Sequence, residues 1–164
     1  MKRALALFLP LALAGCGLKP LYAGGAGGAV ATTLADVDVA PIEGKGGWLV
    51  ANALRDRLAN TGGSARYRLS VRLDDKIAGF GVRRDDSVSR ERRTLRARYQ
   101  LIDTTNNAVL VDATAGADAG IDVVQSEYAT IAAENTALER LATILADKIV
   151  GRVALFAGKP QPSQ

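Results

Sequence analysis

Strict alternation of apolar and polar residues marks the clearest strand of the chain, residues 66–73. One face of such a strand is buried and the other faces water. Residues 88–102 repeat the pattern over a longer strand, and residues 108–119 predict a weaker one. In the first segment the buried positions are Tyr67, Leu69, Val71 and Leu73.

Two other segments place apolar residues at helical spacing. Residues 48–60 carry such a stripe, and the Thr61-Gly62-Gly63 sequence that follows is typical of a helix end. A final helix is predicted from Ser126, which can cap it, to about Ala157, before Gly158 and Pro160. Its expected buried stripe is Ile131, Leu138, Leu141, Ala142, Leu145, Ile149, Val153 and Phe156.

The remaining segments are less regular. Residues 34–42 alternate and end near Pro41, so they predict a first strand, and the glycine-rich residues 43–47 predict a loop. The two aspartates at 74–75 interrupt the alternation, which predicts a bulged continuation of the second strand through residue 82. Asn106-Asn107 predicts a tight hairpin.

The expected order of elements is therefore β-α-β-β-β-α. It predicts an α+β fold, a two-layer sandwich in which a four-stranded, mostly antiparallel sheet carries both helices on one face. The helical crossover places the first strand beside a later one. We expect one domain over residues 33–158 and a disordered tail over 159–164, and the pattern leaves the strand order open.

The N-terminus predicts a lipid anchor. Two positive charges precede an apolar run that is too short for a comfortable membrane span, and Leu13-Ala14-Gly15-Cys16 follows as a lipobox. We expect cleavage of residues 1–15, acylation of Cys16, and a flexible tether over residues 16–32. Gly17 stands where an aspartate would favour inner-membrane retention, so the outer membrane is the expected location, on the periplasmic side.

Composition argues against catalysis. The chain has no histidine, and its one cysteine is the expected acylation site, so the commonest general base, metal ligand and thiol nucleophile are missing. We therefore expect a protein that is not an enzyme, with no metal and no cofactor. An exported, lipid-anchored domain does not meet nucleic acid, so no nucleic-acid partner is expected either.

Arginines supply the candidate binding site. Between residues 83 and 98, seven arginines stand against three acidic residues, whereas residues 103–147 carry eight acidic residues and one arginine. The simpler interpretation is that these arginines form a solvated strand face without a binding function. The alternative is a surface that binds phosphorylated lipid or an acidic protein wall, because a guanidinium grips phosphate with two hydrogen bonds. The candidate residues are Arg66, Arg68, Arg90, Arg92, Arg96 and Arg98.

Three segments carry a family resemblance: residues 16–22 (CGLKPLY), 99–103 (YQLID) and 141–149 (LATILADKI). They resemble the LptE lipopolysaccharide-assembly lipoproteins of the alphaproteobacterial branch. The resemblance implies a non-enzymatic protein that plugs the outer-membrane barrel LptD, helps it assemble and assists lipopolysaccharide insertion into the outer leaflet. No family residue is carried over to a single arginine here. An auxiliary lipoprotein of an ABC-type lipid transporter in the periplasm is the alternative.

Overall fold

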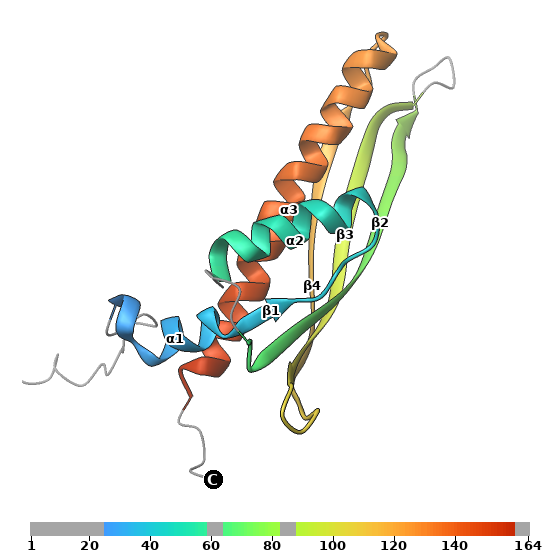
Figure 1. The fold of residues 1–164 in the computed structure, drawn as a ribbon. Helices are drawn as coiled ribbons and strands as arrows, with labels where there is room; N and C mark the ends of the chain where they lie inside the picture. Colours follow the sequence, from blue (N-terminus) through green and yellow to red (C-terminus); the bar gives the residue numbers. More distant parts are fainter. Residues whose placement is uncertain (1–24, 59–63, 83–87, 160–164) are drawn as a thin grey trace, which may run out of the picture.

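Four strands form one sheet in the order β1-β2-β3-β4, and the helices lie on one side of it (Figure 1). The computed structural model describes residues 25–58, 64–82 and 88–159. Its elements are a one-turn 3-10 helix (Gly25–Gly27), α1 (Ala29–Ala35), β1 (Val37–Val39), α2 (Gly44–Leu58), β2 (Tyr67–Val82), β3 (Val88–Asp103), β4 (Val109–Asp122) and α3 (Glu127–Ala157).

The expected α+β architecture is confirmed, with one helix more than expected. β2, β3 and β4 form an antiparallel meander, and β1 pairs in parallel with β2 after the α2 crossover. Ser126 caps α3 by accepting a hydrogen bond from the Ala129 backbone N–H. Asn107 has the positive φ of 58° that its place in the β3–β4 hairpin suggested.

The first strand is much shorter than expected. Residues 34–42 were expected to form it, but only Val37–Val39 do, and Leu34 lies in α1. Val30 and Leu34 are four residues apart, so a helix buries both on the same side, against α3. α1 also begins inside the segment 16–32 that we expected to be a tether.

α2 begins at Gly44, so the glycine-rich segment expected to be a loop is its first turn. Gly47 explains this composition. A Cβ atom at this residue would lie 2.5 Å from the Ile42 carbonyl oxygen and 2.9 Å from the Ile42 Cγ2. Here glycine permits close packing of the helix on the preceding segment instead of breaking the helix.

β2 has no bulge near its aspartates. Its register with β3 is continuous from Tyr67 opposite Asp103 to Phe80 opposite Arg90. Asp75 lies on the same face of the sheet as the buried residues Leu69 and Val71, at the point where the following residues of β2 become exposed. Its carboxylate pairs there with Arg93 at 2.6 Å. The bulge predicted at the aspartates was therefore wrong, because Asp75 is a charged residue at a position that faces the helices and not an interruption of the strand.

The core lies between the sheet and α3, and α2 completes it. Leu95 and Leu101 of β3 and Leu141 and Leu145 of α3 are fully buried. Ile131 was expected in this stripe but is 46% exposed, because α2 first meets α3 further along the helix, where Lys45 bonds Asn135. In β4, Val109 is exposed, whereas Val111 is buried.

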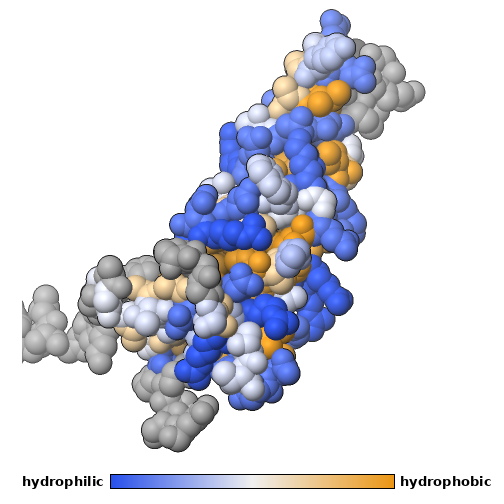
Figure 2. All heavy atoms as spheres, viewed as in Figure 1, coloured by the Kyte–Doolittle hydropathy of each residue, from blue (hydrophilic) through white to orange (hydrophobic). Residues whose placement is uncertain are grey.

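The molecule narrows toward the end formed by the β2–β3 hairpin and the start of α3 (Figure 1). Figure 2 shows small hydrophobic patches near this end and across the middle of the molecule, among hydrophilic residues. Exposed apolar residues of these segments are Ile77, Phe80, Val124, Tyr128 and Ile131. None of the helices in the described ranges has the length and hydropathy needed to cross a membrane.

Candidate functional site: the open face of the sheet

The face of the sheet away from the helices is rich in arginine. Alternation along β2 and β3 directs the odd-numbered side chains toward the helices, where those in the half of the sheet that covers the core are buried, and the even-numbered ones to the open face. We call this surface the open face. Its arginines are Arg68, Arg72, Arg90, Arg92, Arg96 and Arg98.

Three of these arginines surround a shallow hollow at the middle of the sheet. Arg72, Arg96 and Arg98 line a space of about 450 Å³ together with residues of β4. A smaller hollow of about 280 Å³ continues from it and is lined by Ser70, Arg72, Arg98 and Gln100. We call the two together the arginine hollow.

Strand register places like charges next to each other here. Arg72 lies directly opposite Arg98 across the β2–β3 pair. Two cations opposite each other destabilise a sheet unless an anion lies between or beside them. Arg96 is opposite Gly116 on β4, where a Cβ atom would lie 3.3 Å from the Arg96 Cγ. The glycine thus leaves room for the stem of Arg96 over β4.

Only some of the positive charge is neutralised within the protein. Arg98 donates to both Asp112 oxygens, at 3.3 and 3.0 Å, and Gln100 donates to the same carboxylate at 2.8 Å. These donors lower the pKa of Asp112, so it stays ionised and holds Arg98 in place. Within the described residues, Arg72 and Arg96 have no hydrogen-bond or ion-pair partner. The hollow therefore combines one fixed guanidinium with two available ones.

Arginines toward the narrow end are engaged with their neighbours. Arg90 pairs with Asp122 at 2.9 Å, and the guanidinium of Arg92 lies 5.3 Å from the centre of the Phe80 ring. Arg68 belongs to the other end of the open face, opposite Ile102 of β3. These three residues extend the positive face without lining the hollow.

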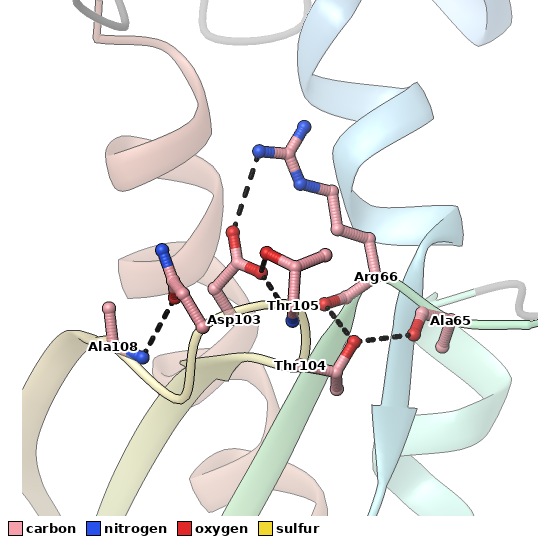
Figure 3. Close-up of polar contacts among 7 residues, drawn as sticks. Ala65, Arg66, Asp103, Thr104, Thr105 and Ala108 are labelled. Atoms are coloured by element: carbon pink, nitrogen blue, oxygen red, sulfur yellow. Dashed lines mark hydrogen bonds and ion pairs between the residues drawn. The ribbon is translucent and has the colours of Figure 1, made fainter. Parts of the chain in front are cut away.

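Arg66 does not belong to the site. Figure 3 shows its side chain directed at Asp103 at the end of β3, 3.4 Å away. The Thr105 hydroxyl and backbone N–H also donate to Asp103, at 2.6 and 2.9 Å. Together these donors, Thr105 first, lower the pKa of the buried Asp103 carboxyl. Arg66 therefore stabilises a hairpin, and its inclusion among the binding residues is not supported by its position.

The strict alternation of residues 66–73 placed Arg72 on the same strand face as Arg68, but Arg72 was not among the candidate binding residues. Cys16, the expected acylation site, lies outside the described residues. No group of three or more acidic, histidine or cysteine side chains that could hold a metal occurs in the described part of the chain.

Comparison with known proteins places this fold among bacterial lipoproteins. A family model described as "LptE: Lipopolysaccharide-assembly" matches residues 34–153, which is most of the chain. No curated protein matches the chain.

Several solved structures share the fold. A Caulobacter crescentus CB15 protein described as a lipoprotein is 25% identical, with a TM-score of 0.68 over 80% of this chain and 97% of that one. The rare lipoprotein B of Shewanella oneidensis is 12% identical, with a TM-score of 0.56 over 73% and 93%. A minor lipoprotein of Acinetobacter baumannii is 14% identical, with a TM-score of 0.55 over 73% and 91%. The last two similarities concern the fold alone.

Proposed function

This chain belongs to the LptE family of lipopolysaccharide-assembly lipoproteins, and from that premise we propose that it is the lipid-anchored partner of an LptD-type outer-membrane barrel. In this role it occupies the barrel, helps it assemble and assists insertion of lipopolysaccharide into the outer leaflet. It works by binding, in keeping with a family whose role is assembly and not catalysis. The anchor is the acylated Cys16, which holds the protein on the periplasmic side of the membrane.

The arginine hollow is the observation that carries the lipopolysaccharide part of this proposal. Lipid A is an anionic, phosphorylated lipid, and a guanidinium binds phosphate oxygens through two parallel hydrogen bonds. Arg72 and Arg96 present such donors without a hydrogen-bond or ion-pair partner among the described residues; Asp74, which lies opposite Arg96, pairs with Lys76 instead. A phosphate bound there would also neutralise the repulsion between Arg72 and Arg98 that strand pairing creates.

Ordering of the hollow favours this role over a merely solvated face. Asp112 fixes the Arg98 guanidinium from the β4 side, so this side chain loses little further freedom when a ligand arrives. Gly116 and Thr114 have small side chains, so this part of β4 does not obstruct the hollow, and a headgroup can enter it. The arrangement can hold and release an anion, because each contact is exposed to water and individually modest.

Co-purification from detergent-solubilised outer membranes tests the proposed partner. We expect a large β-barrel to accompany the full-length protein in stoichiometric amount, and mass spectrometry to find acyl chains on the N-terminal Cys16 peptide. Cys16→Ser should leave the protein unacylated and lower barrel recovery. Recovery of an inner-membrane ATPase instead of a barrel would support the ABC-transporter alternative and contradict the proposal.

A further inference from the structure

β4 leaves one long edge of the sheet unpaired. It stands last in the strand order, and among the described residues it pairs with β3 alone. Its sequence contains no proline and no lysine, two residues with which edge strands commonly discourage pairing by another strand. Nine of its side chains are alanine, glycine, threonine or aspartate between Asp112 and Gly120, so little bulk obstructs the edge.

Register shows which backbone groups face outward. The Val123 N–H donates to the Ser89 carbonyl at 3.0 Å, so odd-numbered residues on this side bond to β3. In an antiparallel ladder the alternate residues then point their N–H and C=O groups away from the neighbour. Lys148 agrees with this assignment, since its Nζ reaches the Gly116 carbonyl at 2.6 Å. The outward residues are Asp112, Thr114, Gly116, Asp118 and Gly120.

Cations of α3 line this edge. Arg140 borders a hollow of about 350 Å³ against the end of β4, and Arg152 and Lys159 border one of about 210 Å³ against its beginning. Lys148 lies between them, on Gly116. A strand added beside β4 would therefore have its helix-side residues next to a row of positive charges.

The same row argues against a second copy of this chain as the added strand. Antiparallel pairing of β4 with another β4 would bring two α3 helices to the same seam, so their cations would face each other. The helix-side residues of β4 are alanines at 113, 115, 117 and 119, which offer no compensating negative charge. A segment with carboxylates on its helix side meets the charge requirement.

We propose that the outer edge of β4 accepts an extended segment of a partner protein as a fifth strand, with acidic residues at alternate positions lying against Arg140, Lys148 and Arg152. Main-chain hydrogen bonds supply the affinity, and the alternate carboxylates supply the selectivity. Lys148 leaves the Gly116 carbonyl and pairs with a partner carboxylate. The site uses outward backbone groups of β4, whereas the arginine hollow uses side chains of the open face, so the two kinds of binding can be tested separately although Thr114 and Gly116 border both.

A peptide of alternating glutamate and threonine is the probe. We expect it to slow amide hydrogen exchange at Thr114, Gly116 and Asp118 of the full-length protein, with no change along β2. Thr114→Pro removes an outward N–H without removing a bond to β3, so it should weaken peptide binding about tenfold or more. Thr114→Ala, the matched control, keeps that N–H and should bind like the wild type.

Charge provides a second readout that does not depend on a proline. Arg140→Glu combined with Arg152→Glu should weaken the glutamate peptide and strengthen a peptide in which lysine replaces glutamate. Equal binding of both peptides to the wild type, or protection away from β4, would overturn the proposal. So would sedimentation showing a dimer that Thr114→Pro dissociates, because a second copy would then occupy the edge.

Discussion

At the scale of single residues, the contrast between paired and unpaired arginines on the open face gives the molecule its binding chemistry. Arg98 and Arg90 each have an aspartate on β4, whereas Arg72 and Arg96 have no such partner among the described residues. An arginine already satisfied by a carboxylate gains little from a phosphate, and an unsatisfied one gains two charge-assisted hydrogen bonds. Ligand binding should therefore depend on which arginines are present and not on the total positive charge of the open face.

Arg72→Ser combined with Arg96→Ser should weaken lipopolysaccharide binding by about tenfold or more, as expected for the loss of charge-assisted hydrogen bonds. Binding can be measured by titration with purified lipopolysaccharide at fixed salt. The matched control removes two cations from the same face, Lys76→Ser with Arg90→Ser, both of which are in ion pairs. An equal loss of binding in the two double variants would show that only total charge matters, and it would support the interpretation of the open face as a merely solvated surface.

Glu91 is a residue whose environment opposes its charge. Its Oε2 is buried without a hydrogen-bond partner within the described residues. Burial, followed by the neighbouring carboxylate of Glu134 on α3, raises the pKa of Glu91 above 4.5. A carboxyl group with a raised pKa in the folded state destabilises the fold when ionised, and protonation relieves that cost as the pH falls.

Glu91→Gln should therefore raise the thermal unfolding midpoint at neutral pH, because it removes the buried charge and keeps the shape. The gain should shrink as the pH falls through the raised pKa of Glu91 toward 4.5, where the wild type becomes protonated too. Scanning calorimetry across this range gives the measurement. Glu139→Gln, at an exposed position of α3, should change little; a gain at Glu91 that is independent of pH would contradict the argument.

At the scale of elements, two glycines of the long helices, Gly47 and Gly151, have opposite roles. Gly47 in α2 lies against Ile42, and a Cβ atom there would collide with its backbone. Gly151 in α3 has no atom within 4 Å of the place a Cβ would occupy. The first glycine is required by packing, and the second is a tolerated weakness of the helix.

Gly47→Ala should lower the free energy of unfolding by roughly 1–3 kcal/mol, the range for overpacking at a close contact. Gly151→Ala should raise it by roughly 0.5–1 kcal/mol, the difference in helix propensity. Denaturant titrations of both variants give these values with the wild type as reference. A stabilising Gly47→Ala would show that α2 can shift away from Ile42.

Elements with a regular pattern could be predicted from the sequence, and those defined by tertiary contact could not. α3 combines a capping serine with a long apolar stripe, and β3 alternates strictly from Thr94 to Leu101, so both were found near their true bounds. α1 is seven residues long and is held by packing of Val30 and Leu34 on a helix more than a hundred positions away. Nothing local distinguishes it from an extended segment.

The candidate site divides in the same way. Alternation placed the arginines on one face, which the structure confirms for Arg68, Arg96 and Arg98. It could not say which of them have partners, because pairing depends on the register of β4, where Asp112 lies opposite Gln100 and beside Arg98. Arg66 was misplaced for a related reason: it precedes β2 and turns toward Asp103 on the hairpin.

At the scale of the whole molecule, the long axis separates two kinds of surface. The described N-terminal segment and the end of α3 lie at one end, and the exposed apolar residues near the β2–β3 hairpin lie at the other (Figure 1). The arginine hollow lies between them, at the middle of the sheet.

The contact between α1 and α3 joins the first and the last α-helix of the described chain, so α1 can pack in place only after α3 has been delivered. A chain threaded through a secretion pore from its N-terminus delivers α1 first and the 31 residues of α3 last. Before α3 is available, the apolar side chains of Val30, Leu34 and the inner face of the sheet remain exposed to water. The unpaired edge of β4 is then a further site at which the nascent chain can aggregate. Apolar surface that stays exposed during this interval makes the incomplete chain prone to aggregation until α3 packs on it.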